Sequence, residues 1–376
     1  METTTAMNQL KQERFEALDI FRGMTIGLMI VVNTPGSWSA TFPPLLHAPW
    51  DGFSPTDLVF PSFLFAVGNA MAFSSRKWDS KSQGQVLGKV FKRFLILFGI
   101  GFLLYWFPFF EMGEEGLRLS PFSETRVFGV LQRIALCYLI GALLIYWLNW
   151  KQLVWVSAAV LLGYWGILHA FGDLTLEGNA ARRLDLWLLG PDHLYKGEGI
   201  PFDPEGLLST LPAVVNVIAG YLLGKFLISR PLNYESLANV LIVASLILFA
   251  GYLWDMTFPY NKKIWTSSYV LLTVGLDMVV VAVIIFARDI GDRNVNFHFF
   301  QVFGMNPLFI YILSQFLVIL MFMITIGDQS LYGWIYENAF AWIGKYWGSL
   351  AFALVYMFIN WLVAKFLWNR GIVIKV

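Results

Sequence analysis

The sequence predicts an all-α polytopic membrane protein with about ten transmembrane helices and both termini in the cytoplasm. Three observations carry this prediction. Hydrophobic residues make up 57% of the 376-residue chain and charged residues only 14%, whereas soluble domains carry about a quarter charged residues. Apolar runs recur along the chain, each long enough to cross a hydrocarbon core of roughly 30 Å. Basic and acidic residues alternate between the connections that join these runs.

The apolar runs follow one another from the first to the last part of the chain. Runs without any charged residue cover 23–46, 58–75, 94–110, 134–150, 152–172, 236–254 and 346–364. Similar runs cover 206–224, 264–287 and 299–326. Only helices and closed barrels satisfy their backbone groups in lipid, and runs of this length are too long for barrel strands. Asp277 lies inside one run and is a site candidate by default.

The charges of the connections set the predicted orientation. The connection after the second run is strongly basic, with Arg76, Lys77, Lys81, Lys89, Lys92 and Arg93 against Asp79. The acidic stretch 171–207 is rich in proline and glycine, which predicts a loop rather than a domain. The positive-inside rule therefore places the basic connections in the cytoplasm and His47 toward the outer face. Residues 1–16 are predicted as a cytoplasmic tail and 17–376 as a single transmembrane domain, without a cleavable signal peptide.

Composition and motifs exclude several classes of function. The single cysteine, Cys137, lies in an apolar run and is predicted to be a buried thiol. A net charge of +1 gives no sign of a nucleic-acid partner. The chain has no Walker loop, no zinc-type spacing of cysteine and histidine, and no GxSxG elbow, so no metal is predicted.

Residues 47–65 form the strongest candidate for chemistry. His47 is close to Trp50 and Asp57 at the mouth of an apolar run, where an imidazole is costly to keep dry. Asn33 ends the preceding run, and the loop 34–46 is able to fold back and bring it near His47. A neutral imidazole is a suitable general base, and an amide donates to an oxyanion. His47 as a helix cap and Asn33 as a turn residue fit the sequence equally well. Asp57 is favoured as a helix cap, with an orienting role toward His47 as the alternative.

Arginines in or beside the apolar runs are a second group of candidates. Arg22 follows Asp19 by three residues, so it either pairs with that carboxylate or meets an anionic ligand. Arg126 and Arg133 are seven residues apart and would line one helix face, beside Gln132. Each arginine pairs with an acidic side chain or holds a phosphate- or pantetheine-bearing cofactor.

Polar residues at the ends of later runs complete the candidates. Asp203 and Glu205 precede a helix that Pro212 is expected to break early, and they either favour the helix dipole or grip an amine-bearing substrate. Lys262 and the lysine after it form a pair suited to an anion. Asn306, before a proline in an apolar segment, marks a discontinuity with an amide available to a ligand.

Several motifs, in this order, resemble the transmembrane heparan-alpha-glucosaminide N-acetyltransferase family over nearly the whole chain after residue 15. They are LDIFRG, VVN, HAPWDGFSPTDLVFPSFLF, GVLQRIALCY, FDPEGLLSTLPAV, NKKIWTSSYV and FGMNPLFIY. The chain is most similar to the shorter, bacterial-type members. The resemblance implies a transfer of acetyl groups from cytosolic acetyl-CoA to the amine of a terminal glucosamine across the membrane. It also implies that His47 is the essential histidine and that Asn33, Arg126 and Arg133 match family positions.

The expected function is therefore a transmembrane acetyltransferase acting on an amino sugar or glycan, in a bacterial inner membrane, without a metal. His47 and Asn33 are the expected catalytic residues, with His47 as general base or as acetyl carrier. The residues expected to hold acetyl-CoA are Arg22, Arg126, Gln132, Arg133 and Asn306. Those expected to hold the acceptor are Trp50, Asp57, Asp203, Glu205 and Lys262. Membrane lipid is an expected partner, and a GxxxG pattern at Gly220 and Gly224 allows a homodimer or helix packing within the chain.

Two other classes of function remain open. A secondary transporter of a small polar or sugar-like solute fits helices broken at Pro35, Pro212 and Pro307 and the internal Asp277. The two halves of the sequence show no repeat symmetry, and this counts against a transporter. A membrane scaffold without catalysis is the third class.

Overall fold

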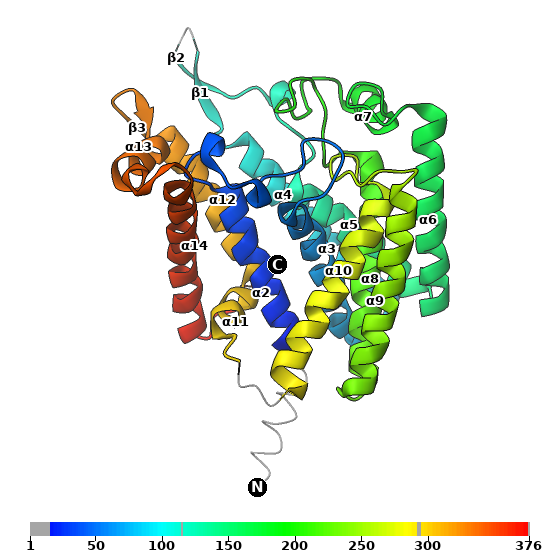
Figure 1. The fold of residues 1–376 in the computed structure, drawn as a ribbon. Coiled ribbons are helices and arrows are strands. Elements are labelled where there is room, and N and C mark those ends of the chain that lie inside the picture. Colours follow the sequence, from blue (N-terminus) through cyan, green and yellow to red (C-terminus); the bar gives the residue numbers. More distant parts are fainter. Residues whose placement is uncertain (1–15, 114–115, 292–294, 375–376) are drawn as a thin grey trace.

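The computed structural model describes residues 16–113, 116–291 and 295–374, which form a bundle of long helices (Figure 1). The helices are α2 (Glu16–Asn33), α3 (Val59–Ser74), α4 (Gln83–Trp106), α5 (Val130–Trp147), α6 (Trp150–Phe171), α7 (Ala180–Leu189), α8 (Leu207–Ser229), α9 (Tyr234–Asp255), α10 (Ser267–Ile285), α11 (His298–Met305), α12 (Pro307–Met323), α13 (Leu331–Ala339) and α14 (Lys345–Asn369). Two antiparallel hairpins were not expected: β1 (Phe110–Gly113) with β2 (Gly116–Leu119), and β3 (Thr325–Ile326) with β4 (Gln329–Ser330). The fold is otherwise helical, as predicted. The predicted tail lies outside the described residues except for Glu16.

The helices identify the chain as an integral membrane protein. Among the described residues, seven helices are long and apolar enough to cross a membrane, and the bent pair α11–α12 makes up to eight. α2 and α4 are long helices outside this set, and each contains three charged residues. The predicted count of about ten spans is therefore not confirmed.

The centre of the bundle is the contact between α3 and α8. In their apolar windows 67% of the residues are buried inside the protein, against 22% for α6 and α9. A Cβ on Gly68 would lie 1.9 Å from the Val217 carbonyl oxygen, and one on Gly220 would lie 2.0 Å from that of Phe65. Glycine thus allows the two backbones to touch. The GxxxG pattern of Gly220 and Gly224 serves this packing within the chain.

Prolines shape three helices in different ways. α2 ends at Asn33, just before Pro35, as expected. The break at Pro307 is also confirmed, because α11 and α12 meet at 84°. The expected break at Pro212 is wrong: α8 is continuous, with Pro212 inside it. This proline is the sixth residue of the helix, so its ring removes only one hydrogen bond close to the helix start.

The two ends of the bundle differ in their connections. α2 begins and α14 ends at the same end, where the basic connection between α3 and α4 also lies (Figure 1). The loop 34–54, the hairpin β1–β2 and α7 lie at the opposite end (Figure 1). The acidic stretch 171–207 is mostly loop, as expected, but it also contains the ten-residue helix α7. Which compartment each end faces stays a prediction.

Candidate functional site

A cavity of about 390 Å³ opens at the end of the bundle where α2 finishes. We call it the His47 cavity. Its walls come from α2, the loop before α3, the end of α4, the loop before α5, the loop before α8 and the loop before α10. The residues that matter below are His47, Asn33, Tyr105, Arg126, Glu205 and Lys262. Segments distant in the sequence therefore converge on one space.

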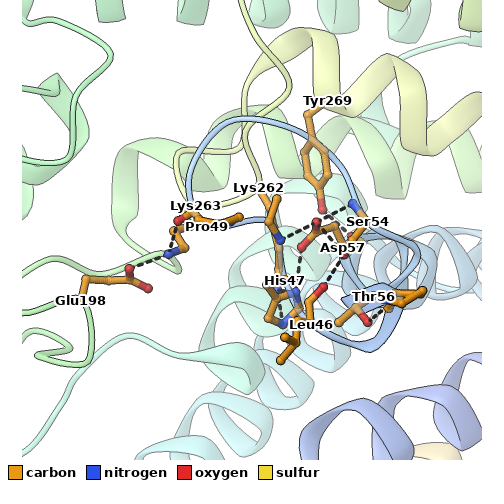
Figure 2. A network of polar contacts seen from close by, with 12 residues as sticks. Leu46, His47, Pro49, Ser54, Thr56, Asp57, Glu198, Lys262, Lys263 and Tyr269 are labelled. Atoms are coloured by element: carbon orange, nitrogen blue, oxygen red, sulfur yellow. Dashed lines mark hydrogen bonds and ion pairs between the residues drawn. The ribbon is translucent and has the colours of Figure 1, made fainter. Parts of the chain in front are cut away.

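His47 lies between a carboxylate and an ammonium group (Figure 2). Its Nδ1 is 2.7 Å from Oδ1 of Asp57. The Nζ of Lys262 lies 2.9 Å from Nε2 and 3.1 Å from Nδ1 of the same ring. A carboxylate only accepts hydrogen bonds, so Nδ1 carries the proton toward Asp57 and Nε2 keeps its lone pair. This tautomer is the one that a general base or a nucleophile requires.

The start of α3 fixes this geometry. Oδ2 of Asp57 accepts hydrogen bonds from the backbone N–H of Ser54 at 2.9 Å and of Ala48 at 3.2 Å. Ser54 and Asp57 form a capping box, and the Ser54 hydroxyl also donates to the Leu46 carbonyl at 2.6 Å. Tyr269 of α10 donates to the Asp57 carbonyl at 2.6 Å. Asp57 thus belongs to a helix cap and contacts His47, so the two readings of the sequence describe one arrangement.

Burial keeps the imidazole neutral. Desolvation by burial lowers the pKa of His47 from its ordinary value. The hydrogen bond to Asp57 acts to raise this pKa and the Lys262 charge to lower it, and the net shift is downward. The side chain is 39% exposed, and the exposed part faces the cavity. His47 is therefore a free base at neutral pH.

The loop before α10 brings two lysines to the cavity. Asn261 donates to Asp51 at 3.1 Å, and the Gly52 N–H donates to the Tyr260 carbonyl at 2.8 Å, which ties this loop to the His47 segment. Lys263 donates to Glu198 at 2.5 Å. Burial lowers the pKa of Lys262, although nearby carboxylates oppose the shift. The predicted lysine pair is thus divided: Lys262 faces His47 and its neighbour forms an ion pair.

Arg126 holds the opposite wall. It donates to both carboxylate oxygens of Asp203, at 2.9 and 2.7 Å, and to Glu205 at 2.6 Å. It also lies over the rings of Tyr105 and Tyr195, 5.0 and 4.8 Å from their centroids. Burial acts to raise the pKa of Glu205, but the charges of Arg126, Arg133 and Lys262 together with the Arg126 hydrogen bond outweigh it, and the net shift is downward. The ion pair proposed as an alternative for Arg126 is confirmed, and Glu205 stays charged in the cavity wall.

Arg133 and Gln132 lie deeper, on α5. The expectation that Arg126 and Arg133 share a helix face is wrong, because α5 begins only at Val130. Arg133 is fully buried, donates to the Gly206 carbonyl at 3.0 Å and to the Ser209 hydroxyl, and lies over Trp265. Gln132 is also fully buried, and within the described chain neither of its polar atoms has a hydrogen-bond partner. Arg133 does not line the His47 cavity.

The remaining candidates divide into cavity and scaffold residues. The loop 34–46 returns the chain so that Asn33 and His47 line the same cavity, and within the described residues the Asn33 amide has no hydrogen-bond partner. Trp50 donates to the Leu174 carbonyl at 2.9 Å and packs against Phe202, so it joins the His47 segment to the stretch 171–207.

Three polar residues lie away from this cavity. Arg22 pairs with Asp19 at 2.6 Å, which is one of its two predicted roles, and also donates to the Gly304 carbonyl. Asn306 donates to the Ile372 carbonyl and accepts from the Ile374 N–H, so it fastens the C-terminal segment to the α11–α12 bend. Asp277 is buried 2.5 Å from the Ser62 hydroxyl. Their assignment to a ligand stays a prediction.

Sequence reasoning missed several cavity residues. Tyr105, Tyr195, Glu198, Tyr311 and Gln315 all line the cavity. Tyr105 and Tyr311 sit in apolar helices, where a tyrosine reads as an interfacial anchor. Glu198 lies in an acidic loop without periodicity. No local signal distinguishes them, because only the packing of distant segments brings them to His47.

The family model and the relatives that match this chain carry the same description. The family model described as "Heparan-alpha-glucosaminide N-acetyltransferase, catalytic" matches residues 14–252, more than half of the chain. Human heparan-alpha-glucosaminide N-acetyltransferase is 26% identical over 360 residues, covering 80% of this chain and 52% of that protein. The mouse protein of the same name is also 26% identical, covering 80% and 53%. The chain spans about half the length of these curated relatives. The match includes His47, Asn33, Arg126 and Glu205 but ends before Lys262.

Proposed function

Because this chain belongs to the heparan-alpha-glucosaminide N-acetyltransferase family, we propose that it transfers an acetyl group from acetyl-CoA to the amine of an amino sugar in the His47 cavity. The relatives carry this activity in their names, with a glucosaminide as acceptor. We further propose that the enzyme lies in a bacterial cytoplasmic membrane with both termini in the cytoplasm, and the basic connections, which the positive-inside rule assigns to the cytoplasm, support this orientation. The observation that carries the proposal is the His47–Asp57 pair in a cavity with an unpartnered Asn33.

His47 receives the proton of the acceptor amine. The amine nitrogen attacks the carbonyl carbon of the thioester, and the carbonyl electrons move to oxygen. As the tetrahedral centre collapses, the carbon–sulfur bond breaks and the thiolate leaves. Nε2 of His47 takes a proton from the nitrogen and returns it to the thiolate, so atoms and charges balance. Asp57 holds the ring in the required tautomer and stabilises the imidazolium.

A two-step route uses the same residues. Nε2 attacks the thioester first, the thiolate leaves, and the acetyl group rests on His47 until the amine takes it. The geometry of the ring is equally suitable for both routes. Labelled acetyl-enzyme after mixing with labelled acetyl-CoA alone would identify the second route.

The cavity provides complementary groups for the other charges. Asn33 lines the same cavity, and in this proposal its amide donates to the oxyanion, a contribution of about 3 kcal/mol for a single donor. Glu205 keeps a negative charge in the wall that attracts the cationic form of the acceptor amine. The tyrosine rings offer the flat, amphipathic surface that sugars prefer.

The decisive experiment measures acetyl transfer from labelled acetyl-CoA to glucosamine with purified protein in detergent. We expect His47→Ala to lose transfer by a factor of about 10²–10⁴ or more, with an unchanged thermal midpoint. His169→Ala is the matched control, because His169 is exposed on α6 and outside the cavity. Full activity in His47→Ala would overturn the assignment. Accumulation of a labelled solute in proteoliposomes without any acyl transfer would support a transporter instead.

A further inference from the structure

The amine of Lys262 lies where an acceptor amine would meet His47. Its Nζ is 2.9 Å from Nε2 and 3.1 Å from Nδ1 of the imidazole (Figure 2). Because the ring proton is on Nδ1, toward Asp57, the lone pair of Nε2 accepts the hydrogen bond from Lys262. In the proposed reaction the acceptor amine gives its proton to this same lone pair. The chain therefore holds an amine of its own at the reacting position.

The two neighbouring lysines of this loop differ in their partners. Lys263 donates to Glu198 at 2.5 Å and to the Pro49 carbonyl at 2.7 Å, so its nitrogen is an ion-paired ammonium (Figure 2). Within the described residues Lys262 forms no ion pair, and its Nζ contacts the two ring nitrogens of His47. Burial lowers the pKa of Lys262. More of Lys262 than of an ordinary lysine is therefore the neutral amine, which is the nucleophilic form.

The backbone that carries Lys262 is held in place on both sides. Asn261 is fully buried, and its side chain accepts a hydrogen bond from the Ile264 N–H at 3.0 Å. Trp265 is also fully buried, and its indole donates to Asn216 at 3.2 Å. The φ of Trp265 is 51°, in the left-handed region, which a large side chain adopts only where the surrounding contacts impose it. The position of Lys262 in the cavity is thus set by the fold rather than by a free loop.

We propose that Lys262 is a site of self-acetylation, at which the chain transfers the acetyl group of acetyl-CoA to its own amine when no acceptor occupies the His47 cavity. This inference rests on the acetyl-CoA donor of the proposed function. The neutral Nζ attacks the carbonyl carbon of the thioester, a carbon–nitrogen bond forms, the carbon–sulfur bond breaks and the thiolate leaves. His47 takes the proton that Nζ loses and returns it to the thiolate, so atoms and charges balance. The products are an amide on Lys262 and free coenzyme A.

Acetylation of Lys262 inactivates the enzyme. An amide nitrogen is neither a base nor a nucleophile, and it is a poor leaving group, so the acetyl group does not move on to an acceptor. The added group fills part of a cavity of about 390 Å³, beside the Nε2 that the acceptor amine needs. The modification also removes the cation that acts to lower the pKa of His47. Acceptor supply thereby controls activity, because a bound acceptor both takes the acetyl group and keeps Lys262 from it.

The test incubates the purified full chain in detergent with labelled acetyl-CoA and without acceptor, and then maps the label by peptide mass spectrometry. We expect the label on Lys262 and not on Lys263, which is the matched control because its amine is ion-paired and adjacent in the sequence. His47→Ala should not be labelled at Lys262. Glucosamine at about ten times its KM should lower the labelling of the wild type about tenfold.

A second readout follows activity. Lys262→Arg keeps the positive charge, but a guanidinium is always protonated and does not accept an acetyl group. Each protein is incubated with acetyl-CoA or with coenzyme A, and its rate of transfer to glucosamine is then compared between the two incubations. We expect the wild type to lose activity in proportion to the label on Lys262. Lys262→Arg should keep the same rate after both incubations.

The other outcomes separate the possible failures. An unlabelled Lys262 in a preparation that acetylates glucosamine would overturn the inference and leave the proposed function in place. Neither label nor transfer would contradict both. Label that persists on Lys262 in His47→Ala, or that is equal on Lys262 and Lys263, would mean that acetyl-CoA reacts with lysines without the site, and the inference would be wrong.

Discussion

The two polar regions at opposite ends of the bundle differ in whether their charged side chains have partners of opposite charge. In the His47 cavity almost every charge meets a partner from the same chain: Arg126 with Asp203 and Glu205, and Lys263 with Glu198. At the other end a basic groove is lined by Arg76, Lys77, Lys81, Lys89, Lys92 and Arg93, and these cations have no carboxylate partner in the described structure. In the first region, ion pairs within the chain hold the charged side chains in fixed positions. The second leaves its cations exposed or half-buried and close to one another.

The difference follows from burial. A charge that loses its water needs a partner nearby, and this is why Arg126 is bound on both sides by carboxylates and aromatic rings. Lysines that remain in contact with water tolerate one another, because solvent and salt screen their repulsion. The same substitution of a cation is therefore expected to cost much stability in one region and little in the other.

The largest expected effect is on activity at the His47 end. Asp57→Asn should reduce acetyl transfer by about 10²- to 10⁴-fold, because an amide does not hold the imidazole proton on Nδ1 or stabilise an imidazolium. Ser54→Ala is the control: it weakens the capping box by about 1 kcal/mol but leaves the contact between His47 and Asp57. Equal losses in both variants would show that Asp57 acts only as a cap.

The second effect is on stability. Arg126→Met leaves Asp203 and Glu205 buried without their cation, which should cost about 3–5 kcal/mol of unfolding free energy. Chemical unfolding in detergent measures this loss. Adding Asp203→Asn and Glu205→Gln to the variant should recover part of it. A stable Arg126→Met protein with weaker donor binding would instead show that this arginine contacts the ligand.

The third effect is a shift of the pH profile. Activity requires neutral His47, whose pKa burial lowers, so the acidic limb should lie below the ordinary histidine value of about 6.5. Lys262 contributes to this lowering. Lys262→Met should therefore raise the pKa and move the limb to higher pH, with little change on the alkaline side. The kcat profiles of the two proteins with the same acceptor test this, and a limb that moves to lower pH would contradict it.

The smallest effect is at the basic groove. A single Lys92→Gln should leave the midpoint of chemical unfolding in detergent unchanged, because this exposed cation has no carboxylate partner to lose within the described structure. Raising the salt concentration should stabilise the wild type slightly more than the variant, because fewer charges are screened in the variant. A large loss of stability would mean that the groove is charge-balanced by the protein after all.

Several residues of the candidate site could be predicted from the sequence, but the contacts between them could not. His47, Asn33 and Asp57 were found because a histidine and an amide beside helix breaks are unusual in apolar sequence. The partner of Arg126 was not predictable, since Asp203 and Glu205 lie more than seventy residues away along the chain. Lys262 was expected to bind a ligand, which stays a prediction, but its contact with His47 was not foreseen. Pro212 was expected to break a helix early, but it lies so close to the start of α8 that the helix stays continuous.

The sequence by itself determined that the chain is helical and lies in a membrane, because long apolar runs leave the backbone no other way to satisfy its hydrogen bonds. It also determined the residue types that carry chemistry at the ends of those runs. Only the tertiary structure decided which of them meet. Helix packing at glycine contacts such as Gly68 and Gly220 sets the positions of whole helices. Those positions, and not local patterns, bring His47, Lys262 and the Arg126 cluster around a single cavity.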